Sequence, residues 1–423
     1  MEATRVQLAQ GVYLTYLPAR KFKTSLLSAQ FVTPLRQDTA GANALLAAVL
    51  RRGTVSCPDM GALSARMDHL YDASIDYTVR KKGENQCVGF VASFIDDCYA
   101  PGGERLLEPV AELLGELVCD PVTFHGRFVP EYFDSEKTNL LEAIRSLIND
   151  KRDWADSRLL SALCAGEAYA IPRLGDEETV DKLQALKVYD QYRQMISTAP
   201  MEIIYSGSAD LERVRLALAA AFATLPREEV RAISVAEPHI GRETVQYVED
   251  AMDVTQGKLG MGFSCGSSDM PALLMGNTLF GGSSNSKLFL NVREKLSLCY
   301  YASSLYHRQK GLITVSSGIE FQNYQKAYDE IMAQLEAVQK GQLEDWELEG
   351  ARSTLLNSYA TIGDSQGKLE NFYLGQAATG RSETPEELAQ AVSEDMTAER
   401  ICRAMETVRL DTVYFLKGKE AEA

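Results

Sequence analysis

Histidine, the residue that zinc hydrolases use most often to hold their metal, is scarce in this chain. Only four occur among 423 residues, namely His69, His125, His239 and His307. A hydrolytic zinc site needs three protein ligands, an open position for water and a carboxylate base. A helix supplies two such ligands on one face when they lie four residues apart. No two of these histidines lie that close, so we predict surface or turn positions for them and no bound metal or other cofactor.

Cysteine and glycine patterns argue against two further kinds of site. The eight cysteines are scattered without a Cys-x-x-Cys pair, which indicates neither a disulfide framework nor a zinc ribbon. A reducing cytoplasm is therefore the simplest location. The pair Gly281-Gly282 is not followed by Gly-Lys-Ser/Thr, so it does not predict a phosphate-binding loop.

The composition is that of a soluble globular protein, with 45% hydrophobic and 24% charged residues. The formal net charge is -16, and no basic stripe interleaved with aromatic residues occurs, so we expect no nucleic-acid partner. The N-terminal residues show no secretory signal pattern. No apolar stretch is long enough to span a bilayer, so we expect no membrane span.

The elements that would position a site recur in the same order in both halves. Strands are predicted at 12–17 and 26–32 (antiparallel to each other), 76–79, 87–94 and 201–207, then at 246–248, 258–263, 300–306, 312–317 and 413–418. Helices are predicted at 41–51, 61–70, 103–118, 131–150 and in shorter pieces through 159–197, then at 271–280, 287–295, 323–339, 344–359 and 366–379. This weak self-similarity predicts a duplicated α+β unit.

A polar, proline-punctuated stretch between Leu225 and Arg242 indicates a linker between the halves. We therefore predict an N-terminal domain at 1–222, a linker at 223–242 and a C-terminal domain at 243–423.

Two segments carry a resemblance to a known family. Residues 41–54 read GANALLAAVLRRGT, and residues 281–300 read GGSSNSKLFLNVREKLSLCY. Together they resemble the insulinase-type (pitrilysin-like, M16-like) zinc peptidases. The resemblance implies two homologous α/β-roll domains, each a mixed, mainly antiparallel sheet packed with helices, which form a clam-shell. It covers nearly the whole chain and points to a bacterial member.

In that family the first helix carries His-x-x-Glu-His, and a downstream helix supplies a third ligand from a Glu-Glu pair. The positions that match here are Ala44, Ala47 and Ala48, with Ala143 at the third ligand. The resemblance thus implies a degenerate zinc site, since alanine neither coordinates zinc nor takes a proton from water. Alanine also preserves the helices and removes polar groups that would need partners without the metal.

The second segment places Arg293 and Tyr300 where family members carry an Arg and a Tyr that reach the substrate peptide. An Arg fork and a phenol can bind peptide carbonyls or polarise a developing oxyanion. Without the resemblance, the plain interpretation is an Arg paired with a neighbouring carboxylate and a Tyr that begins a strand.

Residues 71–77 resemble the family's edge strand, along which substrate adds as a further strand. Asp72 stands where the family usually has Asn, followed by Ala73. When ionised, Asp72 accepts hydrogen bonds and donates none, which weakens this match. An ordinary turn from helix to strand explains these residues about as well.

The resemblance implies a non-catalytic subunit that binds peptide or unfolded polypeptide and completes a processing chamber with a zinc-bearing insulinase-type paralogue. One alternative is a purely structural scaffold subunit, which would have no need of Arg293 and Tyr300. The other is an active metallopeptidase with unconventional ligands, for which the sequence offers no candidates.

Overall fold

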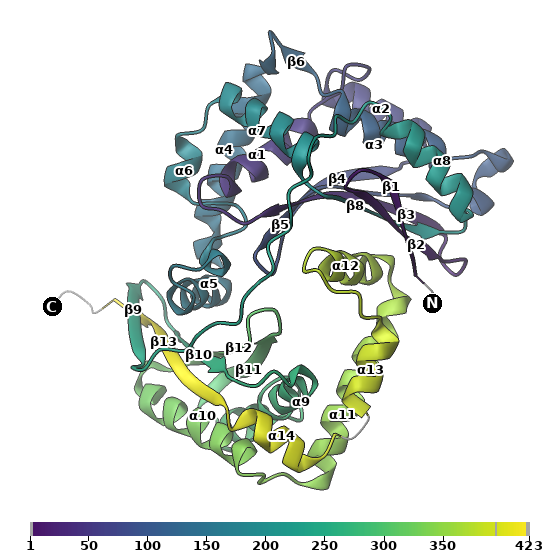
Figure 1. Cartoon of the computed structure of the whole chain (residues 1–423). Helices are drawn as coiled ribbons and strands as arrows, with labels where there is room; N and C mark the ends of the chain where they lie inside the picture. The colour runs from purple at the N-terminus through teal and green to yellow at the C-terminus, as the bar shows by residue number, and fades with distance from the viewer. Residues whose placement is uncertain (1–2, 394–395, 420–423) are drawn as a thin grey trace. The chain divides into compact units, whose positions relative to one another are not determined.

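The computed structural model describes residues 3–393 and 396–419, which form two compact units (Figure 1). Unit 1 is built from residues 1–145, 171–235 and 363–382, and unit 2 from 146–170, 236–362 and 383–423. Each half of the chain therefore gives one segment to the unit formed mainly by the other half. The division into domains at 1–222 and 243–423 stays a prediction. Residues 223–245 form no helix or strand.

Unit 1 contains a six-stranded sheet in the order β1-β2-β8-β3-β5-β4. Its strands are β1 (Thr4–Ala9), β2 (Val12–Pro18), β3 (Thr24–Pro34), β4 (Ser74–Lys82), β5 (Asn85–Ile95) and β8 (Met201–Gly207). All neighbours are antiparallel except the parallel pair β2 and β8. The strands predicted at 12–17 and 26–32 do run in opposite directions but do not pair, because β8 lies between them.

Unit 2 repeats this arrangement in a five-stranded sheet of order β11-β12-β10-β13-β9. Its strands are β9 (Gln246–Met252), β10 (Gly257–Cys265), β11 (Cys299–His307), β12 (Leu312–Ile319) and β13 (Val408–Gly418). Again only one pair, β13 and β9, is parallel. The order and direction match β4-β5-β3-β8-β2 strand for strand. The predicted α+β duplication with mainly antiparallel sheets is confirmed.

Helices cover both sheets. Those of unit 1 are α1 (Ala40–Leu50), α2 (Met60–His69), α3 (Leu107–Cys119), α4 (Pro130–Ser146), α6 (Glu177–Asp181), α7 (Ala185–Thr198), α8 (Leu211–Ala221) and α12 (Gln366–Ala377). Those of unit 2 are α5 (Lys151–Leu163), α9 (Met270–Phe280), α10 (Tyr324–Gln339), α11 (Asp345–Ala360), α13 (Pro385–Ser393), α14 (Ala398–Met405) and a π-helix, η5 (Leu288–Lys295). A small hairpin joins β6 (Thr123–Phe124) to β7 (Arg127–Phe128). Every residue of α1 is buried, which explains its run of alanine and leucine.

The exchanged segments each bring a helix onto a sheet. Helix α12, coloured yellow-green in Figure 1, packs on β8 and β3, while α5 packs on β10 and β13. The approach of α5 is close, since a Cβ at Gly262 would lie 2.7 Å from Leu163 Cδ2. On α12, the buried Glu370 accepts two hydrogen bonds of 2.6 Å from Arg80 and one of 2.7 Å from Ser28. Polar contacts thus fix α12 to the sheet.

Glu370→Gln is expected to destabilise the chain by about 2 kcal/mol, because it leaves the half-buried Arg80 without its carboxylate. The midpoint of urea unfolding measures this change. Asp364→Asn is the matched control, since Asp364 lies in the same segment but pairs with Lys21 in a solvent-exposed bridge of 3.0 Å. Exposed pairs contribute about 0–1 kcal/mol, so equal effects of the two substitutions would contradict this account of α12.

No helix in residues 3–393 or 396–419 combines the length and the apolar character needed to cross a lipid bilayer.

Candidate functional site

A cavity of about 780 Å³ lies beside β4, the edge strand of the sheet in unit 1. Helices α1 and α4 line it together with residues 77–82 of β4, Arg173 and Asn371 of α12. We call this cavity the edge-strand pocket. Because its walls come from α1 on one face of the sheet and α12 on the other, the pocket follows the unpaired side of β4.

The three positions at which the resemblance expects zinc ligands meet in this pocket. Ala44 and Ala48 of α1 line it, and so does Ala143 of α4. Ala47, which matches the catalytic base, is 1% exposed and packs in the hydrophobic core. The pocket surface at these positions consists of methyl groups, which offer no lone pair to a metal.

The carboxylates closest to Ala143 in sequence do not form a replacement site. Glu136 lines the pocket, but its side chain is nearly buried and pairs with Arg52 at 2.8 Å. Asn139 also donates to Glu136, at 3.2 Å. Glu142 is exposed and is not part of the pocket wall. An ion-paired Glu136 is a structural anion, and it is poorly placed to act as a general base.

Basic side chains dominate the charge of the edge-strand pocket. Arg80, Lys81 and Lys82 of β4 line it together with Arg173. Burial lowers the pKa of the Lys82 ammonium, and the neighbouring Arg80 guanidinium lowers it further. Where the family would place a zinc ion, this chain therefore surrounds a cavity with cationic side chains.

The turn before β4 explains the residue type at position 72. Tyr71 and Asp72 both adopt left-handed backbone conformations, with φ of 58° and 60°. Asn and Asp tolerate this region better than most residues, so the turn alone accounts for either residue here. Asp72 is exposed, whereas Ala73 is buried and donates its N–H to the Met67 carbonyl at 3.3 Å. A substrate-binding role for Asp72 and Ala73 stays a prediction.

Arg293 and Tyr300 lie in unit 2, on the packed neighbours η5 and β11. Tyr300 is 61% exposed on β11, which is the edge strand of its sheet. The Arg293 side chain is 40% exposed. Its guanidinium lies 4.7 Å from the Phe289 ring and 3.6 Å from the Glu294 carboxylate. These weak contacts leave both polar ends accessible to a ligand. Their contact with peptide stays a prediction.

His239 departs from the expectation that each histidine is a surface or turn residue. It is buried, and ligand atoms of His239, Cys164 and Glu167 lie within 4.8 Å of one another. Its Nδ1 lies 2.5 Å from Glu167, its Nε2 lies 3.3 Å from Asp411, and the buried Lys310 ammonium lies 2.6 Å from Glu167. Because Lys310 already supplies a cation to Glu167, we interpret the group as an ion-pair network in unit 2. The sequence missed it because its members are far apart in the chain.

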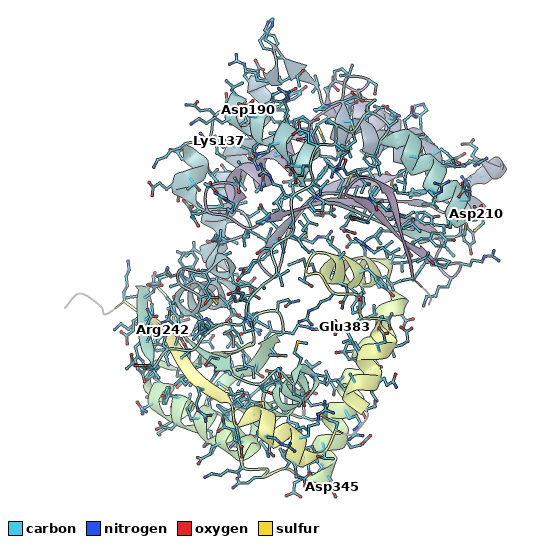
Figure 2. All side chains as sticks on the ribbon, in the orientation of Figure 1. Lys137, Asp190, Asp210, Arg242, Asp345 and Glu383 are labelled. Carbon is cyan, nitrogen blue, oxygen red and sulfur yellow. The ribbon has the colours of Figure 1, made fainter. Side chains whose placement is uncertain are left out.

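Lowering the pH is expected to weaken this network. Burial alone would raise the pKa of the Asp411 carboxyl, but hydrogen bonds from Arg242 (labelled in Figure 2) and Thr412 hold it below its ordinary value. Such a carboxylate stabilises the fold above its unfolded pKa, and the contribution is lost as the pH falls below about 4. Asp411→Asn should therefore cost about 2 kcal/mol at pH 7 and less at pH 3. Urea unfolding across this range measures the difference, and a constant gap between the proteins would contradict the assignment.

Comparison with known proteins agrees with the fold. Residues 182–355 match the family model described as "Peptidase M16 inactive domain". The "Probable inactive metalloprotease YmfF" of Bacillus subtilis (strain 168) is 35% identical over 416 residues, which are 97% of this chain and 96% of that protein. The "Uncharacterized zinc protease YmxG" of the same strain is 20% identical over 342 residues, covering 78% of this chain and 82% of that protein.

Among solved structures, the crystal structure of a conserved protein from Enterococcus faecalis V583 superposes with a TM-score of 0.89. It is 28% identical and covers 100% of both chains. The sequence match to YmfF spans nearly the whole length of both proteins, and the matching family model is that of an inactive domain. The chain therefore belongs to the M16 family of insulinase/pitrilysin-type peptidases, as a non-catalytic member similar to YmfF.

Proposed function

We propose that this chain is a peptide-binding subunit that completes a processing chamber with a zinc-bearing insulinase-type partner. The observation that carries the proposal is the edge-strand pocket, in which β4 pairs with no further strand of the described residues on its outer side and lies beside three alanines at the ligand positions. An unpaired edge strand can bind an extended peptide through its main chain without any catalytic group. Hydrolysis of that peptide then needs zinc from another subunit.

Relatives and exposed residues support a partnership. Bacillus subtilis (strain 168) contains both the inactive-type relative and a relative named as a zinc protease. In unit 2, the exposed ends of Arg293 and Tyr300 are available to a peptide. A scaffold subunit would have no need of these two side chains. Substitutions at Arg293 and Tyr300 therefore separate the peptide-binding hypothesis from the scaffold hypothesis. The eight cysteines form no disulfide within the part of the chain that the structure describes, which fits the proposed cytoplasmic location.

Reconstitution tests the proposal. The chain and the zinc-bearing M16 relative from its own genome would be purified separately and mixed, and a library of quenched fluorescent peptides would report cleavage. We expect zinc only in the partner, co-elution of the two chains on gel filtration and cleavage at least about tenfold faster in the mixture than in either protein alone. Co-elution without any gain in cleavage would favour the scaffold hypothesis. Cleavage by this chain alone, with stoichiometric zinc, would overturn the proposal.

A further inference from the structure

The charge of the edge-strand pocket is opposite to that of the whole chain. The protein carries a formal net charge of -16, yet the pocket is lined by four basic side chains and one acidic one, Glu136. Since Glu136 is neutralised by Arg52 at 2.8 Å, it does not balance the basic side chains. The excess of positive charge is therefore local to this cavity.

Two of these basic side chains form no ion pair or hydrogen bond with a carboxylate among the described residues. Arg80 donates two hydrogen bonds to Glu370 and so holds α12 against the sheet. Lys82, in contrast, donates only to the side-chain and main-chain oxygens of Asn371, at 2.6 and 3.3 Å. Arg173 donates to the Val79 carbonyl at 3.2 Å. Lys82 and Arg173 are thus cationic donors whose hydrogen-bond acceptors are all neutral, although the charge of Glu370 also acts on Lys82 without forming an ion pair.

We propose that the edge-strand pocket binds a carboxylate of the peptide that adds to β4, with Lys82 and Arg173 as its cationic partners. The inference rests on the proposed peptide-binding function and adds its substrate class, an acidic peptide or one with a free C-terminus. Main-chain pairing with an edge strand is indifferent to sequence, so specificity and register must come from side-chain pockets. A carboxylate bound beside Ala44 and Ala48 fixes that register.

Charged residues on an edge strand also have a plainer role, because they discourage sheets from pairing with one another. That role needs a charge of either sign, whereas binding of a carboxylate needs positive charge. Reversal of the charges separates the two explanations. Lys82→Glu/Arg173→Glu keeps the edge charged but should abolish binding of acidic peptides.

Calorimetric titration of the full chain with three strand-length peptides tests the inference. The peptides share one neutral sequence; the first carries a glutamate and an amidated C-terminus, the second only a free C-terminus, and the third no carboxylate. We expect a preference of about tenfold for one or both anionic peptides over the neutral one. The first two peptides show whether a side chain or the terminus supplies the carboxylate. Raising the salt to about 0.5 M should reduce the preference.

Two double variants test which residues cause the preference for anionic peptides. Lys82→Gln/Arg173→Gln should bind all three peptides with the affinity of the neutral one. The matched control Lys187→Gln/Arg215→Gln removes two exposed charges of α7 and α8 outside the pocket and should keep the preference. Thermal unfolding checks that both double variants fold. Equal binding of the three peptides by the wild type would overturn the carboxylate site and leave peptide binding intact. Failure to bind any of them, alone or with the zinc-bearing partner, would overturn the proposed function itself.

Discussion

Arg293→Ala is expected to lower kcat/KM for peptide cleavage by the reconstituted pair about 100-fold, and Tyr300→Phe about tenfold. One preorganised donor aimed at a developing oxyanion contributes about 10²–10³ in rate. A guanidinium offers a charged, two-pronged donor and a phenol one neutral donor, so the loss at Arg293 should be larger. Cleavage rates at several substrate concentrations measure both changes.

The same substitutions should leave folding nearly unaffected. Tyr300 is 61% exposed, and the Arg293 side chain makes weak contacts in unit 2, with Glu294 at 3.6 Å and the Phe289 ring at 4.7 Å. Surface changes of this kind alter stability by less than about 0.5 kcal/mol. Lys295→Ala is the matched control, because Lys295 is an exposed cation on the same π-helix. Full peptidase activity of the partner reconstituted with the Arg293→Ala chain would exclude a shared site and favour the scaffold hypothesis.

The sequence predicted the repeated elements because their burial patterns are local. Helix α1 is buried along its whole length, and its alanine and leucine content indicated both its limits and its apolar environment. Strand β4 was predicted at 76–79 but runs from Ser74 to Lys82. Its last three residues, Arg80, Lys81 and Lys82, lack apolar alternation because they lie along the pocket at the edge of the sheet.

What the sequence could not predict depends on contacts between distant segments. The sequence of α12 carries only a weak amphipathic pattern, so it shows neither which face of the helix is covered nor which sheet covers it. In the structure, Glu370 of α12 meets Arg80 and Ser28, about 290 and 340 positions earlier in the chain. The positive charge of the edge-strand pocket is hidden for the same reason, since Arg173 reaches β4 from a separate loop.

Restoring the ligands should restore the metal. The triple variant Ala44→His/Ala48→His/Ala143→Glu is expected to bind about one equivalent of zinc with a Kd of about 1 µM or tighter. The reason is geometric, because all three positions line one pocket. Without zinc the variant should be less stable than the wild type by about 2 kcal/mol, since two alanines in a buried helix become polar side chains. Zinc analysis and urea unfolding with and without chelator measure both effects.

The double variant Ala44→His/Ala48→His is the control for position 143, because it lacks the third ligand. If Ala143 is the third ligand position, the double variant should bind zinc at least about tenfold more weakly than the triple. Equal binding by the double and triple variants would contradict the assignment of Ala143 as the third ligand position. The basic side chains that line the pocket repel a zinc ion. Adding Lys82→Gln and Arg173→Gln to the triple variant should therefore tighten zinc binding. Zinc alone should not produce cleavage, because position 47 still lacks a base; only the further change Ala47→Glu supplies the carboxylate that water activation needs.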